Sequence, residues 1–231
     1  MKAILFGGTG MIGQGVLMEC LADPEVEQLL VVGRGPSGTK DPKVTDLVMP
    51  DMFDYSAVAA SLAGYDACFY CLGVSSAGMN EADYTRVTYD LAMAVAQALY
   101  KANPKMTFCF ISGASTDSTE KGGAMWARVK GKTENAILKI GFKAAYMFRP
   151  GLIQPLKGIK SRTAGYRAFY TAFGWLLPVV KTVLPSTITT TERLGIAMIN
   201  AAKKGYSATI LETRDINLLA GPQTGKIPLQ L

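Results

Sequence analysis

The sequence predicts an α/β protein built on a doubly wound, mainly parallel sheet of about seven strands. Apolar runs of strand length alternate with segments of helix length, and the first run ends in a glycine-rich turn that opens a helix. Of the 231 residues, 49% are hydrophobic and 18% are charged, which is the composition of a folded chain and excludes disorder. No linker or internal repeat interrupts the alternation, so we expect residues 1–231 to form a single domain.

The apolar runs predict the strands, and the segments between them predict helices on both faces of the sheet, because parallel strands need crossover connections. The expected strands are residues 2–6, 28–32, 44–49, 66–72, 106–112, 143–148 and 208–211. The expected helices are residues 11–22, 55–62, 82–102, 123–140 and 192–203. Thr189 and Glu192 have the spacing of a capping box, which predicts the start of the last helix.

Residues 151–188 break this alternation, because they are rich in Gly, Pro, aromatic and basic residues. Insertions beyond the strand ends build substrate sites in such folds, so we predict a small C-terminal insertion on the substrate side. Within it, the apolar stretch 169–183 is interrupted by Gly174, Pro178 and Lys181. This pattern favours a buried helix or a dimer surface over a membrane anchor.

Several kinds of chemistry are excluded by composition. The chain has no histidine, which rules out Ser-His or Cys-His catalysis and histidine-ligated zinc. Cys68 and Cys71 form a C-x-x-C, but residues three apart in a strand point to opposite faces. We therefore predict that the four cysteines are packing thiols, and we expect no metal site.

The N-terminal residues run directly into glycines without an apolar signal segment, and no apolar run reaches the roughly 18–20 residues that span a bilayer. These features lead us to expect a cytoplasmic location.

Charge is distributed unevenly around the net value of +6. Residues 1–100 carry 5 basic and 12 acidic side chains, whereas residues 101–204 carry 17 basic and 4 acidic ones. A basic half is compatible with a phosphate-bearing ligand, an anionic membrane surface or nucleic acid, although solvated lysines explain most such biases. No nucleic-acid recognition motif accompanies the charge, so we do not expect nucleic acid as a partner.

The turn after the first strand satisfies the glycine pattern of a dinucleotide-binding site in its required strand-turn-helix context. Early glycines permit a tight turn and close approach of a pyrophosphate, the last glycine lets helix and strand pack closely, and free amides attract the anion. The residues expected to form this cradle are Gly7, Thr9, Gly10, Met11, Ile12 and Gly13.

The second strand ends near Arg34, where NAD-binding proteins of this kind place an acid for the ribose 2′-hydroxyl. A guanidinium there favours NADP over NAD, because it can pair with the 2′-phosphate, although a solvated loop arginine is the alternative. Asp51 and Met52, together with Phe53, follow the third strand and either contact adenine or start a helix.

Seven further short blocks of sequence are spread along nearly the whole chain, and their order and spacing are typical of one protein family. They are Val32-Gly33-Arg34, Cys71-Leu72-Gly73, Arg86-Val87, Ile111-Ser112, Val129-Lys130-Gly131, Phe148-Arg149-Pro150-Gly151 and Leu211-Glu212. With the glycine turn, they resemble the atypical extended branch of the short-chain dehydrogenase/reductase superfamily, which includes the Tat-interacting-protein-like oxidoreductases. The resemblance implies an NAD(P)-binding Rossmann fold. It also implies cofactor contacts at Leu72, Gly73, Lys130, Pro150 and Gly151.

The same family uses a Tyr and a Lys spaced Y-x-x-x-K, assisted by a Ser after the fifth strand. The resemblance places Lys130 at the lysine, Trp126 at the tyrosine, and either Ser112 or Ser115 at the serine. An indole N–H does not titrate near neutral pH, so Trp126 cannot serve as the general acid or base. Candidates for a replacement are Tyr84, Tyr89 and Tyr166.

Two functions are therefore open. The first is a weak or unusual NADP-dependent oxidoreductase acting on a carbonyl or sugar-derived small molecule. The second is a catalytically silent NADP-binding regulatory or partner-binding protein. A membrane-surface or assembly factor that uses the insert around residues 157–181 is a third, less favoured reading. The apolar insert and the family habit favour a homodimer without establishing it.

Overall fold

The computed structural model describes residues 1–159 and 187–222. Its centre is a sheet of seven parallel strands in the order β3-β2-β1-β4-β5-β6-β9, which confirms the predicted architecture. The strands are β1 (Lys2–Phe6), β2 (Gln28–Gly33), β3 (Val44–Val48), β4 (Ala67–Tyr70), β5 (Thr107–Ile111), β6 (Ala144–Arg149) and β9 (Ile210–Glu212). Apart from the edge strands β3 and β9, their residues are mostly buried, as strands covered on both faces require.

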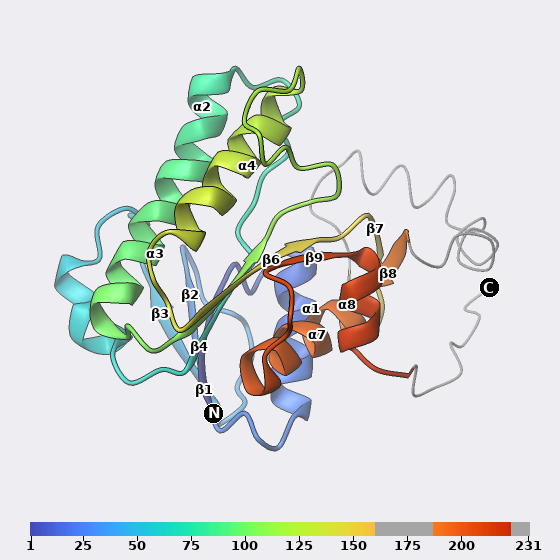
Figure 1. Ribbon diagram of the computed structural model, residues 1–231. Helices are drawn as coiled ribbons and strands as arrows, with labels where there is room; N and C mark the ends of the chain where they lie inside the picture. Colours follow the sequence, from blue (N-terminus) through green and yellow to red (C-terminus); the bar gives the residue numbers. More distant parts are fainter. Residues whose placement is uncertain (160–186, 223–231) are drawn as a thin grey trace.

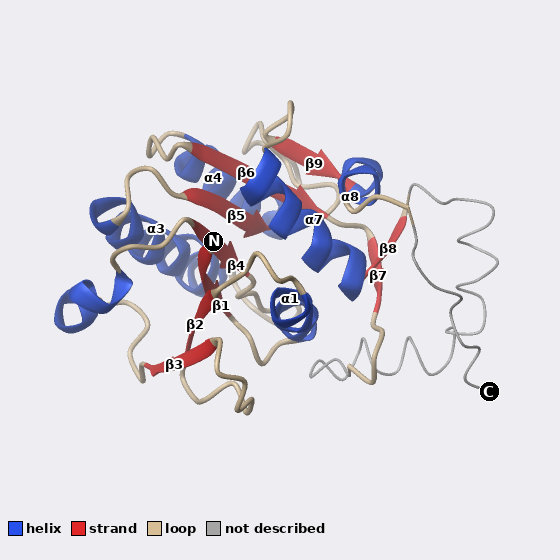
Figure 2. Ribbon diagram, turned by 90° about the horizontal axis from the view of Figure 1, so that it is seen from below, coloured by secondary structure: helices blue, strands red, loops and turns tan. Residues whose placement is uncertain are grey.

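Helices cover both faces of the sheet (Figures 1 and 2). On one face lie α1 (Met11–Ala22), α7 (Thr191–Lys204) and α8 (Thr213–Leu219). On the other lie the 3₁₀ segment η1 (Ser56–Leu62), α3 (Leu91–Ala102) and α4 (Met125–Leu138). Successive residues of β1 serve opposite cores: Ala3 and Leu5 pack under α1, and Ile4 and Phe6 pack under α3. The chain is thus doubly wound.

The expected helix over residues 82–102 is divided into three segments. It begins as α2 (Glu81–Thr85), passes through the π-helical η2 (Arg86–Asp90) and continues as α3. Periodicity cannot show an inserted residue of this kind, because the apolar pattern resumes after it.

The predicted capping box is wrong by one residue. The cap of α7 is Thr190, whose side chain accepts a hydrogen bond from Arg193 N, while Thr189 donates to Asn217 Oδ1. Thr189 is instead part of β8 (Ile188–Thr190), which pairs with β7 (Leu152–Gln154) in a small parallel sheet. Neither this strand pair nor α8 was predicted from the sequence, because these elements are short. The stretch 169–183 and Tyr166 lie outside the described residues.

The cysteines agree with the strand pattern. All four are free; Cys68 packs in the core under α3, and Cys71 packs against the core under α1. No described helix is long and apolar enough to cross a membrane.

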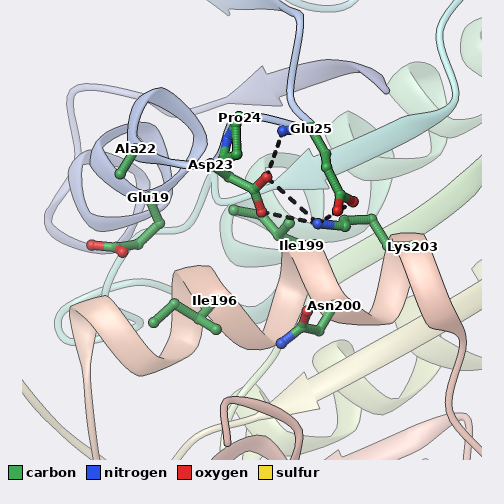
Figure 3. A pocket seen from close by; sticks show the side chains of 9 residues that line it. All are labelled: Glu19, Ala22, Asp23, Pro24, Glu25, Ile196, Ile199, Asn200 and Lys203. Carbon is green, nitrogen blue, oxygen red and sulfur yellow. Dashed lines mark hydrogen bonds and ion pairs between the residues drawn. The ribbon is translucent and has the colours of Figure 1, made fainter. Parts of the chain in front are cut away.

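Helices α1 and α7 approach so closely that glycine is required at their contact. A Cβ at Gly15 would lie 2.7 Å from both Cβ and O of Thr191, and one at Gly195 would lie 3.2 Å from Gly15 O. Figure 3 shows the hollow where these helices end. There Lys203 Nζ lies 3.2 Å from Asp23 Oδ2 and 2.5 Å from Glu25 Oε2, so one ammonium bridges two carboxylates.

We predict that Gly15→Val lowers the free energy of unfolding by about 1–3 kcal/mol, because the branched side chain meets backbone atoms that cannot move away. Urea denaturation measures the loss. Gly123→Val is the matched control, since a Cβ at Gly123 meets nothing within 4 Å and we expect a change within about 0.5 kcal/mol. Equal stabilities of the two variants would contradict the packing argument.

Candidate functional site

A cleft follows the carboxyl ends of the central strands, where the strand order turns back between β1 and β4. Open α/β sheets bind their ligands at this switch point. The cleft has two adjoining parts, a β2-side hollow of about 900 Å³ and a β5-side hollow of about 790 Å³. Leu72, Gly73 and Val74, from the loop after β4, line both.

Most residues expected at the site line this cleft. In the β2-side hollow they are Gly7, Thr9, Arg34, Asp51 and Met52. In the β5-side hollow they are Gly10, Met11, Ile12, Ser112, Trp126, Lys130, Pro150 and Gly151. Gly13 and Ser115 were also expected at the site, but neither is among the described residues that line the cleft.

The glycine turn is shaped by close backbone contacts. Gly7 has a φ of +81°, and a Cβ there would lie 2.9 Å from the Cys71 carbonyl carbon and oxygen. A Cβ at Gly13 would lie 2.0 Å from Gly7 O, so this glycine supports the turn from beneath. At Gly10 a Cβ would meet only Gly7 O, at 3.3 Å. The surface above Gly10 is therefore open toward the cleft.

The N-terminus of α1 is free to bind an anion. Its N-cap, Gly10, makes no side-chain capping bond, and the first turn contains no acid. The amides of Met11 and Ile12 have no acceptor within the helix, and both residues line the cleft. This donor set, with the open surface above Gly10, fits a pyrophosphate group.

Arg34 and Asp51 line the β2-side hollow from opposite loops. Arg34 is exposed and forms no ion pair with any described residue. Asp51 Oδ1 accepts a hydrogen bond from Phe53 N at 2.8 Å, which closes a local turn. Since η1 begins only at Ser56, Asp51 does not start a helix, which was one of the two alternatives for this loop.

Lys130 lines the β5-side hollow from α4. Its Nζ donates a hydrogen bond to Ile111 O at 3.4 Å and lies 5.6 Å from the centroid of the Phe110 ring. Burial lowers the pKa of Lys130 to about 8, although the Glu134 carboxylate one turn later opposes that shift. The ammonium is therefore a stronger acid than an exposed lysine.

The two candidate serines lie in different surroundings. Ser112 is buried, with Oγ 2.9 Å from Thr116 Oγ1, whereas Ser115 is exposed with a φ of 66°. Thr116 donates its own hydroxyl proton to Gly113 O at 2.7 Å, so the proton between the two hydroxyls belongs to Ser112. In this arrangement Ser112 Oγ can accept a hydrogen bond from the cleft but has no proton left to donate.

Two aromatic side chains line the β5-side hollow. Trp126 lies there, and so does Tyr84 from α2, which is 2% exposed. Burial raises the pKa of Tyr84, so its phenol stays protonated. Tyr89 lies elsewhere, with Lys132 Nζ 4.5 Å from its ring centroid.

No role was predicted from the sequence for Arg86 or Val74, which also line the cleft. Arg86 stood only within a family block, and its acidic neighbours Asp83 and Asp90 give it the appearance of an ordinary helix-surface arginine. Val74 carries no recognisable signal.

We predict that Lys130 makes stability depend on pH. Below pH 8 it is charged in both the folded and the unfolded protein, so the folded state bears the cost of desolvating it. Between pH 8 and about 10.5 only the unfolded state holds the proton, so stability rises with pH. The free energy of unfolding of the wild type should therefore increase relative to that of Lys130→Met over this range. Parallel curves for the two proteins would contradict the assignment.

The fold and the cleft define a Rossmann-type dinucleotide-binding protein. The model of the "NAD dependent epimerase/dehydratase family" matches residues 3–122, so the chain belongs to that family of extended short-chain dehydrogenase/reductases. The match ends before Trp126 and Lys130. The family match therefore covers the half of the chain that contains the glycine turn, and it does not extend to Trp126 and Lys130 on α4.

Relatives and solved structures agree with this family. The chain is 28% identical over 213 residues to "Protein fmp52, mitochondrial" of Emericella nidulans, covering 89% of each chain. It is 26% identical to "Protein fmp52-2, mitochondrial" of Aspergillus oryzae, covering 93% of this chain and 94% of the relative. In structure it is similar to MoeE5 in complex with UDP-glucuronic acid and NAD, with a TM-score of 0.67, 13% identity, and coverage of 91% and 75% of the two chains.

The expected cytoplasmic location is contradicted by these relatives, whose names place them in mitochondria. The expectation depended on the lack of an apolar N-terminal segment. That pattern tests for a secretory signal only, because mitochondrial targeting uses other features.

Proposed function

We propose that the chain is an NADP-dependent oxidoreductase that acts, weakly by the standard of its family, on an uncharged carbonyl compound. The observation that carries this proposal is the position of Lys130 in the β5-side hollow, one helical turn after Trp126 and in the same hollow as Ser112. We also propose that residues 1–231 form one domain with residues 151–188 as its substrate-side insertion. The continuous sheet from β1 to β9 supports the single domain.

The residues that would hold the cofactor come from four segments. The α1 amides would bind the pyrophosphate, Arg34 the 2′-phosphate, and Lys130 the nicotinamide ribose. Asp51, Met52, Leu72, Gly73, Pro150 and Gly151 would complete the cleft walls. When bound, the reduced cofactor would supply a hydride to the carbonyl carbon, and a residue of the chain or a water would have to supply a proton to the carbonyl oxygen.

We propose that Lys130 supplies this proton, directly or through water. With a pKa of about 8 it is the described cation in the β5-side hollow whose proton is most easily released. Trp126 does not titrate, Tyr84 has a raised pKa, and Ser112 is committed to Thr116. The described walls are otherwise mainly apolar, which favours an uncharged substrate over the nucleotide sugar seen in MoeE5.

A silent NADP-binding protein is the second candidate, and Trp126 is the observation that favours it. The two candidates share the same cofactor contacts and differ only in whether a carbonyl compound is reduced.

We predict that NADPH binds more tightly than NADH and that Arg34→Ala removes the preference. A charge-assisted contact of about 1.5–3 kcal/mol corresponds to roughly 10–150-fold in affinity for NADPH, with NADH unchanged. Fluorescence titration of both cofactors measures this. Arg214→Ala is the matched control, because Arg214 is exposed on α8 and is not among the cleft residues. Equal dissociation constants for the two cofactors in the wild type would overturn the NADP assignment.

We predict that Trp126→Tyr raises reductase turnover at least about 10-fold, because a phenol four residues before Lys130 restores a proton donor whose pKa the lysine lowers. Steady-state NADPH oxidation with a panel of aldehydes, ketones and quinones measures it. Trp126→Phe controls for the change of shape and should give no gain. A wild-type rate equal to that of ordinary family reductases would contradict this prediction, and inactivity of all three proteins despite NADPH binding would favour the silent candidate.

A further inference from the structure

Ser112 brings a hydrogen-bond acceptor to the β5-side hollow. Its Oγ lies 2.9 Å from Thr116 Oγ1, and Thr116 Oγ1 donates to Gly113 O at 2.7 Å. A hydroxyl has one proton and two lone pairs, so the Ser112 proton points to Thr116 and the lone pairs of Ser112 Oγ remain for a ligand. Ser112 is only 7% exposed, and it lines the hollow. A ligand there can therefore donate to this buried oxygen but cannot accept from it.

Three other side chains bring donors to the same hollow. The Lys130 ammonium and the Trp126 indole both carry N–H groups and have no acceptor atom. Tyr84 also lines the hollow, and its phenol keeps its proton because burial raises its pKa. A carbonyl oxygen only accepts hydrogen bonds, so it suits these donors. It cannot bond to Ser112 Oγ, which needs an O–H or N–H from the ligand.

We propose that the substrate carries a hydroxyl on the carbon next to its carbonyl and that this hydroxyl donates to Ser112 Oγ. The substrate class is then an α-hydroxy aldehyde or ketone. This inference rests on the proposed oxidoreductase function and names the class of carbonyl compound that it acts on.

The positions of Lys130 and Ser112 favour two groups on adjacent carbons. Lys130 Nζ donates to Ile111 O at 3.4 Å, and Ser112 is the next residue of the chain. The donor and the acceptor are therefore held at consecutive residues at the end of β5. A carbonyl and a hydroxyl on adjacent carbons can contact both groups at once, whereas a longer spacer between them separates the two oxygens.

The hydroxyl would serve for binding and would not react. In the reduction, a hydride from the reduced cofactor bonds to the carbonyl carbon, and the electron pair of the C=O π bond takes a proton from Lys130. The products are a vicinal diol and the oxidised cofactor, and Lys130 regains its proton from water. The hydroxyl beside the reacting carbon keeps its O–H bond throughout. A substrate without it leaves the buried Ser112 acceptor unpaired, which weakens its binding by about 10-fold or more.

Hydroxyacetone and methoxyacetone form a matched pair of substrates, because both carry an electron-withdrawing oxygen beside the carbonyl and only the first has an O–H. We expect kcat/KM for NADPH-dependent reduction to be at least about 10-fold higher for hydroxyacetone. It should also exceed the value for 4-hydroxy-2-butanone, in which one more carbon separates the two groups. Saturation-transfer NMR with the NADP⁺-loaded protein compares the affinities of the same compounds without turnover.

Variants of Thr116 test whether this residue sets the direction of the Ser112 hydroxyl. Thr116→Val removes the acceptor of the Ser112 proton, so Ser112 becomes able to donate and the preference for hydroxyacetone should fall below about 3-fold. Thr116→Ser keeps the hydroxyl and should keep the preference. Thr45→Val is the matched control, because Thr45 is exposed on the edge strand β3. Circular dichroism and thermal melts establish that each variant is folded.

The remaining outcomes contradict the inference in distinguishable ways. Equal kcat/KM for hydroxyacetone and methoxyacetone in the wild type would overturn the substrate class while leaving the reductase. A preference that persists in folded Thr116→Val would show that Ser112 is not the group that reads the hydroxyl. A wild type that reduces neither compound but binds hydroxyacetone more tightly would overturn the oxidoreductase and support the hydroxyl contact. A wild type that neither reduces nor binds them would overturn both.

Discussion

The geometry of the site depends on one buried ion pair, Arg149 with Glu134. Glu134 is fully buried on α4, and Arg149 at the end of β6 binds both of its oxygens, with Nε at 3.0 Å from Oε1 and an Nη at 2.5 Å from Oε2. The same guanidinium bonds Ser118 Oγ at 2.6 Å and approaches Glu212 Oε1 at 3.6 Å. Helix α4, the loop after β5 and strand β9 are therefore joined at one cation. Removing one partner of such a pair costs about 3–5 kcal/mol, because the other charge stays buried.

This pair also sets the environment of Lys130. Glu134 lies one turn beyond Lys130, but both of its oxygens are bound to Arg149. The carboxylate therefore opposes the shift of the Lys130 pKa without cancelling it, and the pKa stays near 8. Close packing holds the same helix in place, since a Cβ at Gly131 would lie 1.8 Å from Asp117 O. The arginine of the Phe-Arg-Pro-Gly block thus acts as an anchor, while Pro150 and Gly151 after it line the cleft.

Sequence predicted the parts of the molecule that depend on local pattern. The seven strands and the glycine turn follow from apolar runs and from backbone approaches that only glycine permits, such as Gly13 against Gly7 O. The cap at Thr190 was placed at Thr189 because a motif fixes spacing, whereas the pairing of β7 with β8 decides which threonine is free to cap. The sequence likewise could not decide whether Ser112 or Ser115 occupies the serine position, because that choice depends on the conformation of the loop. A left-handed φ turns Ser115 outward, and no pattern of residue types encodes that.

The β5-side hollow combines a retained electrostatic arrangement with a changed proton chemistry. The first residues of α1, Lys130 and Ser112 all line this hollow, so the groups proposed to position a dinucleotide and a substrate lie together. At the tyrosine position, an indole replaces a phenol. Because Ser112 gives its proton to Thr116, the hydroxyl that would assist a tyrosine acts here only as an acceptor. Ser112 Oγ acts as an acceptor and the indole of Trp126 does not titrate. Among the described residues of the hollow, the Lys130 ammonium is therefore the proton donor whose pKa lies closest to neutral. The departure at Trp126 and the lowered pKa of Lys130 therefore belong to one local arrangement, and the proposed function assigns to this single lysine both the cofactor ribose and the exchangeable proton.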